Sequence, residues 1–191
     1  LDGRVNQLQN HMDQINIALE SDFFEYIEGS AKVVSKNGVA VESEGTTQEL
    51  EADYIILATG SRPRKLSHLP IDEEIVMTSD GLPKMNQFPK SIVILGAGVI
   101  GCEFATIFSG FGKTKVHLID KGDRILPFED EDVVRVVEKS LEERGVLIHR
   151  NSRLTDMKVV EGAVQYNLEY TDGSTEVFDV EKALISVGRV P

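Results

Sequence analysis

The chain has 191 residues, of which 41% are hydrophobic, and a formal net charge of −12. This length suits one or two domains with enough apolar residues for a core. A protein needs a positive surface field to bind nucleic acids or anionic membrane surfaces. The acidic net charge therefore argues against both as partners. Cys102 is the only cysteine, which excludes an internal disulfide, a zinc cluster and a CxxC redox pair.

The sequence contains no apolar run of the roughly 18–20 residues that a membrane-spanning helix needs. Its N-terminal LDGRVNQLQN is not a signal sequence either, so a cytoplasmic location is expected. The chain begins at Leu1 rather than at a methionine and stops at Pro191 within a motif. We therefore expect it to be an excised part of something longer.

The N-terminal part predicts a helix and then a hairpin. Apolar residues at three-to-four spacing over 1–20 are typical of an amphipathic helix. FFEYIEG (23–29) predicts a short strand. AKVVSKNGVAVESEG (31–45) predicts a hairpin in which Asn37 and Gly38 supply the positive φ angles of a tight turn.

The next segments predict strands and a connection. Another strand edge begins at 48–51, and DYIILATG (53–60) predicts a buried strand that ends at a glycine. SRPRKLSHLPIDEE (61–74) is rich in proline and charge, which indicates a segment that crosses between domains.

The middle of the chain alternates strands and helices. SIVIL (91–95) is continuously apolar, as in a strand covered on both faces. A helix is expected from about 98 to 110 and a strand at KVHLID (115–120). A second helix is expected at 129–145, with acids at its start and a glycine as its stop, before the strand VLIHR (146–150).

From Thr155 the pattern changes to a meander that ends in KALISVG (182–188). Alternating strands and helices followed by a meander predict an α/β, Rossmann-like domain with a parallel sheet plus an antiparallel β-meander. The chain also carries a weak internal echo, because LEADYIILATGSRP (50–63) and FDVEKALISVGRVP (178–191) share an apolar strand followed by Gly, Arg and Pro. Two nucleotide-binding domains of the same kind, the first incomplete, would produce this echo.

GAGVIG (96–101) places three glycines at GxGxxG spacing between the SIVIL strand and the following helix. Gly96 permits the tight turn, Gly98 lets a pyrophosphate approach the backbone, and Gly101 lets the helix pack closely on the strand. The amides and dipole at the helix start supply the positive potential that the net charge lacks. The alternative is a structural strand–helix turn with incidental glycines.

Asp120 lies about 20 residues beyond the third glycine, at the end of the second strand. An acid there accepts hydrogen bonds from the adenosine ribose and repels a 2′-phosphate, which predicts NAD over NADP. Lys121 and Arg124 lie close enough to soften that repulsion, so NADP stays open as a cofactor. The alternative is an ordinary surface aspartate.

The remaining candidates point to no catalytic group. Glu103 is expected in the first helical turn, where the dipole alone favours an acid, and Cys102 is interpreted as a packing residue. No metal site or triad is expected, because the four histidines are scattered, with no ligand spacing and no paired acid: His11, His68, His117 and His149. They are interpreted as surface or strand residues. A short-chain dehydrogenase is excluded, since none of the tyrosines has a lysine four residues later.

Four motifs in register carry a resemblance to a known family: ATGSRP (58–63), GAGVIGCE (96–103), RILP (124–127) and SVGRVP (186–191). Together they resemble the middle of a pyridine nucleotide–disulfide oxidoreductase of the dihydrolipoamide dehydrogenase type, over essentially the whole chain. The chain is also similar to the soluble pyridine nucleotide transhydrogenases, flavoproteins of the same fold that lack the redox disulfide. The resemblance implies an FAD domain interrupted by an NAD(P) domain, with a homodimer formed through a C-terminal domain.

On this resemblance, residues 1–72 are the later part of the FAD-binding domain, residues 73–187 are the NAD(P)-binding domain, and residues 188–191 return into the FAD domain. It implies an NAD site at Gly96, Gly98, Val99, Ile100, Gly101, Glu103, Asp120, Lys121 and Gly188. It implies FAD contacts at Ala58, Thr59, Gly60 and Arg189, and near Ser30 and Ala31. No catalytic residue is expected in the chain, because the family's redox cysteines and its acid–base histidine belong to other segments.

The expected function is to hold NAD(P)H against the flavin of an FAD-dependent oxidoreductase for hydride exchange, and the chain alone is expected to be inactive. A soluble transhydrogenase is the alternative parent. A non-catalytic nucleotide-sensing module would explain the glycines and Asp120, but not ATGSRP and its echo. One departure from the family is that GKTKVHLID (112–120) is one residue longer than the usual turn, which leaves the register before Asp120 open.

Overall fold

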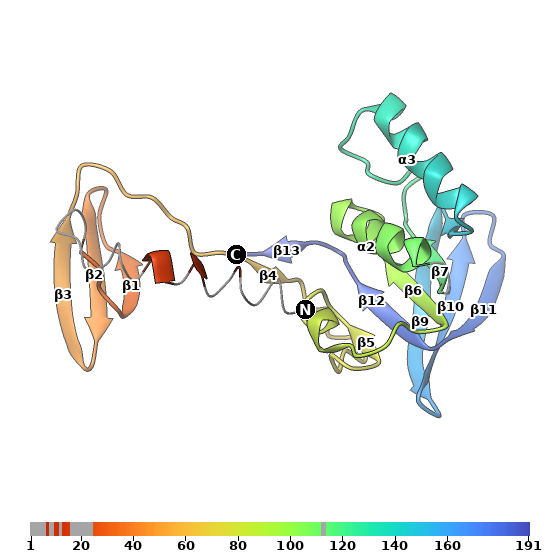
Figure 1. Cartoon of the computed structure of the whole chain (residues 1–191), viewed down its shortest axis with the longest axis horizontal. Helices are drawn as coiled ribbons and strands as arrows, with labels where there is room; N and C mark the ends of the chain where they lie inside the picture. The colour runs from red at the N-terminus through yellow and green to blue at the C-terminus, as the bar shows by residue number, and fades with distance from the viewer. Residues whose placement is uncertain (1–6, 8–9, 12, 16–24, 112–113) are drawn as a thin grey trace. The chain divides into compact units, whose positions relative to one another are not determined.

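The computed structural model describes residues 7, 10, 11, 13–15, 25–111 and 114–191. The chain divides into two compact units, residues 1–58 and residues 59–191, which are described separately (Figure 1). The predicted division into domains of a larger protein, at residues 72 and 187, remains a prediction.

The first unit is built on an antiparallel sheet in the order β1-β2-β3. Its strands are β1 (Ser30–Val33), β2 (Gly38–Ser43) and β3 (Thr46–Glu51). The predicted hairpin is confirmed, since β1 pairs antiparallel with β2.

The turn chemistry of this sheet differs from the prediction. Positive φ angles are found at Glu44 (49°) and Gly45 (79°), in the turn between β2 and β3, and at neither Asn37 nor Gly38. The Asn37 side chain instead donates from Nδ2 to the carbonyl oxygen of Ala52 at 2.7 Å. The asparagine therefore closes the end of the sheet through its amide group rather than through its backbone conformation.

The N-terminal predictions are only partly covered. Residues 7, 10, 11 and 13–15 are helical, and the rest of the helix predicted over 1–20 lies outside the described residues. The strand predicted at 23–29 is wrong where it is described, because residues 25–29 form no strand.

The second unit contains a parallel sheet in the order β5-β12-β6-β7-β8. Its strands are β5 (Val76–Met77), β6 (Ser91–Leu95), β7 (Lys115–Ile119), β8 (Leu147–His149) and β12 (Lys182–Ile185). The segment between β5 and β6 includes a short 3₁₀ helix, η1 (Leu82–Lys84). The predicted Rossmann-like parallel sheet is thus confirmed.

Helices and a meander cover opposite faces of this sheet (Figure 1). α2 (Val99–Gly110) and α3 (Glu131–Glu143) pack on one face. The other face is covered by β9 (Ser152–Val160), β10 (Ala163–Tyr170) and β11 (Thr175–Val180). These three strands form the predicted antiparallel meander. The placement of 182–188 at its end is wrong, because residues 182–185 form β12 of the parallel sheet.

The continuous apolar run of β6 follows from this layering. Ile92 and Ile94 are fully buried against the helices, whereas Val93 is fully buried against the meander. Successive side chains of a strand point to opposite faces, so a strand between two apolar layers needs apolar residues at every position.

α3 lies within the helix predicted over 129–145 and has the predicted acids at its start and glycine after its end. The Asp130 carboxylate caps it by accepting from the amide of Asp132 at 2.9 Å, and Gly145 follows its end with φ 83°. Arg135 pairs with Glu131 at 3.5 Å on the exposed surface of α3.

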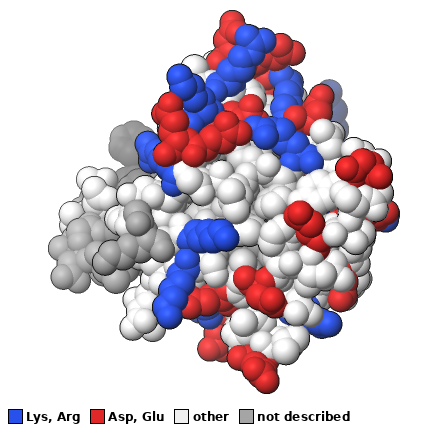
Figure 2. All heavy atoms as spheres, turned by 90° about the vertical axis from the view of Figure 1, so that its right-hand side faces the viewer, with Lys and Arg blue, Asp and Glu red and all other residues white. Residues whose placement is uncertain are grey.

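On the face shown in Figure 2, basic side chains of the described residues are interspersed with acids rather than gathered into one patch. Of the helices in the described part of the chain, none combines the length and apolarity needed to cross a membrane.

The last residues of the two echoing segments lie side by side within the second unit. β4 (Arg62–Pro63) pairs antiparallel with β13 (Arg189–Val190), and the amide of Arg64 donates to the carbonyl oxygen of Gly188 at 3.0 Å. The backbone contact is therefore confined to the Arg-Pro ends of the echo and does not include its apolar parts.

The strand predicted at 53–60 is wrong. This segment adopts no regular structure, and the side chains of Tyr54 and Ile56 are 91% and 89% exposed. A strand is stable only when its backbone groups pair with a neighbour, and none of the described strands pairs with this segment.

Candidate functional site

The glycine loop joins β6 to α2 under tight steric limits. Gly96 has φ 101°, and a Cβ added there would lie 2.6 Å from the carbonyl oxygen of Ser186. A Cβ at Gly101 would lie 1.9 Å from the carbonyl oxygen of Gly96. The tight turn at Gly96 and the close helix packing at Gly101 are the features that the glycine spacing predicts.

Gly98 differs from these two glycines because its surroundings are open. It is the N-cap of α2, in an extended conformation, and an added Cβ would meet nothing within 4 Å. Gly98 has no side chain to cap α2. The first amides of a helix have no partner within the helix, so the start of α2 offers N–H donors to an anion.

A cleft of about 790 Å³ opens beside this helix start. It lies at the carboxyl ends of the parallel strands, next to β6. The chain continues from β6 to its neighbour β7 on one side, and β12, which comes later in the sequence, lies on the other side. Such a reversal of strand order is where open α/β sheets bind ligands. Many of the predicted cofactor residues line the cleft: Gly96, Gly98, Val99, Ile100, Asp120, Lys121, Gly188 and Arg189.

Asp120 is held in place by the backbone around it. Its Oδ2 accepts from the amide of Ala97 at 2.8 Å, and its Oδ1 accepts from the amide of Gly122 at 2.9 Å. The carboxylate therefore ties the end of β7 to the glycine loop, a role that the sequence does not reveal. Each carboxylate oxygen has a second lone pair, so Asp120 can also accept from a ligand in the cleft.

The loop between β7 and α3 is tied to the glycine loop at a second point. The amide of Leu126 donates to the carbonyl oxygen of Ala97 at 2.8 Å. The amide and the carbonyl group of Ala97 are therefore both hydrogen-bonded to the segment that follows β7. Leu126 has φ 47°, an uncommon conformation for a residue other than glycine. Two residues further on, the side chain of Phe128 is 98% exposed and lines the cleft.

The cleft is locally basic although the chain as a whole is acidic. Arg153 lines it and pairs with Glu169 at 2.6 Å, whereas Lys121 forms no ion pair with any described residue within 4 Å. Sequence reasoning missed several lining residues: Arg64, His68, Phe128 and Arg153. Arg64 and His68 lie in the crossing segment, whose charge was a usable signal, but nothing local marks Arg153.

Some predicted residues do not line the cleft. Gly101 is buried beneath it, and Glu103 is exposed on α2. The placement of Glu103 in the first helical turn is wrong, because α2 begins at Val99 and has no acid in its first turn.

The residues predicted to contact FAD are divided between the two units. Ala31 and Ala58 belong to the first unit, and Thr59, Gly60 and Arg189 belong to the second, so their joint site stays a prediction. Gly60 is exposed with φ 73° and open space at its Cβ position. The guanidinium of Arg189 donates from Nε to the hydroxyl of Ser61 at 2.8 Å and from Nη2 to the carbonyl oxygen of the same residue.

Cys102 is a packing residue, as predicted. Its side chain is buried, and its Sγ lies 3.4 Å from the carbonyl oxygen of Ala97. Burial raises the pKa of the thiol to about 12, so it stays protonated and unreactive at neutral pH. Within the described ranges, no three His, Cys, Asp or Glu side chains come together in a way that could hold a metal ion.

Two histidines that look unrelated in the sequence meet between the sheet and the meander. His149 Nε2 lies 3.3 Å from Nδ1 of His117, which lies 2.8 Å from the hydroxyl of Tyr166. Tyr170 lies 2.8 Å from His149 Nδ1 and donates to a carboxylate oxygen of Glu176 at 2.9 Å. These histidines lie in strands β7 and β8, as interpreted from the sequence, but they are not scattered, because they contact each other. Glu176 is linked to His149 through Tyr170.

Burial sets the charge state of this cluster. It lowers the pKa of His117 to about 4 and also lowers the pKa of His149. Both rings are therefore neutral at pH 7, and the cluster joins β7 and β8 to the meander without a buried charge. Neither histidine lines the cleft beside α2.

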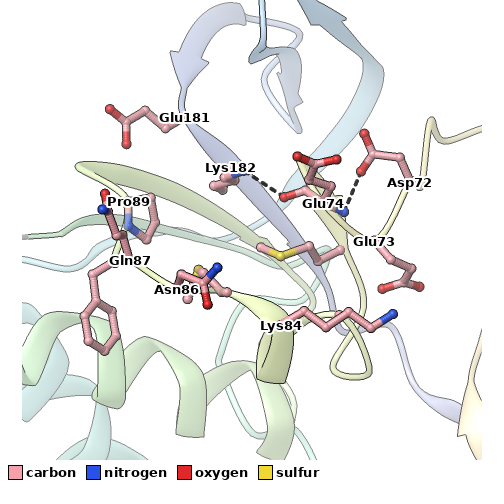
Figure 3. Close-up of a pocket in the computed structure, with 13 residues that line it drawn as sticks. Asp72, Glu73, Glu74, Lys84, Asn86, Gln87, Pro89, Glu181 and Lys182 are labelled. Atoms are coloured by element: carbon pink, nitrogen blue, oxygen red, sulfur yellow. Dashed lines mark hydrogen bonds between the residues drawn. The ribbon is translucent and has the colours of Figure 1, made fainter.

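A second cavity of about 630 Å³ lies elsewhere in the second unit (Figure 3). Its acidic side chains are used by nearby groups of the protein. Asp72 accepts from three backbone amides, Glu73 accepts from the amide and hydroxyl of Thr78, and Glu181 accepts from the amide of Lys90. Asp72 and Glu73 stabilise a local turn, and Glu181 joins the start of β12 to the residue before β6. The cavity shows no arrangement for chemistry.

Comparison with known proteins agrees with this architecture. Residues 3–191 match the family described as pyridine nucleotide-disulphide oxidoreductase. A dihydrolipoyl dehydrogenase of Bacillus subtilis is 30% identical over the whole chain, which covers 41% of that protein. A soluble pyridine nucleotide transhydrogenase of Mycobacterium bovis is 31% identical over 93% of the chain and 37% of its own length.

Solved structures give the same result. The crystal structure of LpdA from Mycobacterium tuberculosis superposes with a TM-score of 0.80 at 29% identity, over 99% of this chain and 42% of that one. The flavoprotein disulfide reductase RclA from Escherichia coli superposes with a TM-score of 0.73 at 28% identity, over the same shares of the two chains. The chain spans about two fifths of the relatives that it matches. From the family match and the shared fold, the chain belongs to the pyridine nucleotide-disulphide oxidoreductase family.

Proposed function

We propose that the second unit binds a pyridine dinucleotide in the cleft beside α2, with the pyrophosphate at the helix start. The observation that carries this proposal is Gly98, whose open Cβ position lies in the cleft at a helix start without a side-chain cap. A phosphate there receives N–H donors from the backbone of Val99 and Ile100 together with the positive end of the helix dipole.

The ends of the cleft distinguish the two halves of the ligand. Asp120 and Lys121 follow β7, the position at which this fold contacts the adenosine ribose. Gly188 follows β12, on the opposite side of β6. The nicotinamide half therefore points toward Gly188. Glu103 lies on α2 outside the lining of the cleft, and the proposed contact with the nicotinamide ribose requires the ligand to extend beyond that lining.

We further propose that this chain is part of an FAD-dependent oxidoreductase. Ala31, Ala58, Thr59, Gly60 and Arg189 would contact the FAD, and the open left-handed position at Gly60 leaves room for such a group. When bound, the flavin supplies the electron transfer. This chain orients the nicotinamide, which is how a protein lowers the entropic part of such a barrier.

The relatives support two kinds of parent enzyme, a dihydrolipoyl dehydrogenase and a soluble transhydrogenase. The proposed dinucleotide site serves either of them. A homodimeric parent remains a prediction from the family resemblance, and a cytoplasmic location remains a prediction from the sequence.

NAD is the proposed ligand in preference to NADP. The Asp120 carboxylate is fixed by two backbone amides at the adenosine end of the cleft, so its negative charge cannot easily move away from a 2′-phosphate. Lys121 and Arg153 also line the cleft and reduce this repulsion, so the preference is expected to be moderate.

Calorimetric titration of the chain with NADH and NADPH tests the proposal. NADH should bind more tightly, and Asp120→Asn should bring the two affinities closer together. Asp123→Asn is the matched control, because this exposed acid of the same loop does not line the cleft. Failure of the unmodified chain to bind either nucleotide would contradict the proposed site, and an unchanged affinity ratio in Asp120→Asn would contradict the role of Asp120.

A further inference from the structure

Phe128 is an aromatic side chain that the protein leaves almost entirely in solvent at the edge of the cleft. Its side chain is 98% exposed, yet it lines the same cavity as Gly98 and Asp120. Phe128 has no role in the dinucleotide binding proposed for this cleft. Tyr54 is similarly exposed, but it lies in the unpaired segment before the second unit and lines no described cavity.

The backbone that carries Phe128 is fixed on both sides. Before it, the amide of Leu126 is bonded to Ala97, and Nη2 of Arg124 donates to the carbonyl oxygen of Pro127 at 2.7 Å. After it, the amide of Glu129 donates to the carbonyl oxygen of Leu126 at 3.0 Å, and Asp130 caps α3. The exposed ring is therefore held at the cleft by an ordered loop, which reduces the entropy lost when it contacts a ligand.

The same loop identifies the half of the ligand that Phe128 meets. It begins at Asp120 and Lys121, on the β7 side of the glycine loop, where the adenosine half of a dinucleotide lies. Adenine is the flat, weakly polar group at that end. Leu154 of β9 lines the same cleft and adds a further apolar surface.

We propose that Phe128 stacks on the adenine ring of the bound dinucleotide. This inference rests on the proposed function and adds a binding residue to it. Stacking of an aromatic side chain on a base requires only two flat faces, and the phenyl ring has no competing contact with the protein to break. Leu126 has a strained left-handed backbone conformation, of the kind often found at ligand sites. On this proposal, that conformation helps to hold the Phe128 ring at the cleft.

A tryptophan at this position provides a direct probe. The chain contains no tryptophan, so Phe128→Trp introduces a single indole fluorophore. ADP-ribose, which carries the adenine, should quench its emission on binding, whereas nicotinamide mononucleotide, which lacks adenine, should not. Equal responses to the two ligands, or no response to ADP-ribose at a concentration that calorimetry shows to be saturating, would overturn the proposal.

Affinity measurements separate this inference from the proposed function. Phe128→Ala should weaken the binding of NADH and ADP-ribose on the order of 10-fold and leave nicotinamide mononucleotide unaffected. Tyr54→Ala is the control, because it removes an equally exposed ring outside the cleft and should change no affinity. If the unmodified chain binds no NADH, the proposed function fails. If it binds NADH and Phe128→Ala binds it equally well, only the role of Phe128 fails.

Discussion

Of two segments with similar apolar sequences, one forms a buried strand and the other adopts no regular structure. YIIL (54–57) and SIVIL (91–95) are both apolar and both precede a glycine segment. SIVIL forms β6, paired with β12 and β7 and covered on both faces. YIIL forms no strand, and the side chain of Ile56 is 89% exposed.

The difference shows that an apolar run specifies a strand only when other strands are in place to pair with it. The free energy of a strand comes from its hydrogen-bonded neighbours and from the layers that cover its faces, and these lie far away in the sequence. β6 obtains its partners from residues 115–119 and 182–185 of the same unit. We expect YIIL to require strands from outside the described part of the chain.

The largest expected effect comes from removing one isoleucine side chain in each segment. Ile94→Ala leaves a cavity between β6 and the helices, so it should lower the free energy of unfolding of the second unit by about 2–5 kcal/mol. Ile56→Ala should change the free energy of unfolding of the first unit, to which it belongs, by no more than about 0.5 kcal/mol, because the side chain is already in water. Urea denaturation of both variants measures this contrast. Equal losses would mean that YIIL is packed in solution.

A smaller effect is expected from acid in the second unit. The folded state keeps His117 neutral, with a pKa of about 4, whereas the unfolded chain takes up the proton near the ordinary value of 6.5. Stability from this histidine is therefore complete above pH 6.5 and is lost as the pH falls toward 4. The loss should be on the order of 2–3 kcal/mol.

Denaturation curves at pH 7, 6, 5 and 4 measure this loss, with His117→Gln as the comparison. The variant removes one titrating group, so its stability should depend less steeply on pH in this range than that of the unmodified chain. Identical slopes would show that protonation of His117 does not limit the stability of the second unit.

The same contrast explains how much of the molecule could be predicted. Strand β6, helix α2 and the glycine turn between them are set by local spacing and by steric limits at Gly96 and Gly101, so the sequence indicates them directly. The cap at Asp130 is likewise local. The predictions from the sequence were wrong where the structure of a segment depends on distant strands, as in the unpaired segment 53–60.

The site shows the same division. The position of Asp120 at the end of β7 could be predicted, but its two hydrogen bonds to backbone amides could not, because they depend on how the loops cross. His117 and His149 meet only because β7 and β8 are neighbours in the folded sheet. The exposure of Phe128 follows from loop anchors at Ala97 and Leu126 that no local pattern signals.

The most direct test of the central claim is the affinity of Gly98→Ala for NADH. An added Cβ at Gly98 would meet no protein atom within 4 Å and its φ is −76°, so the fold should keep its thermal stability. The same Cβ lies where the pyrophosphate is proposed to approach the helix, so calorimetry should show NADH binding weakened at least 10-fold. Unchanged affinity in a fully folded variant would contradict a dinucleotide site at the start of α2.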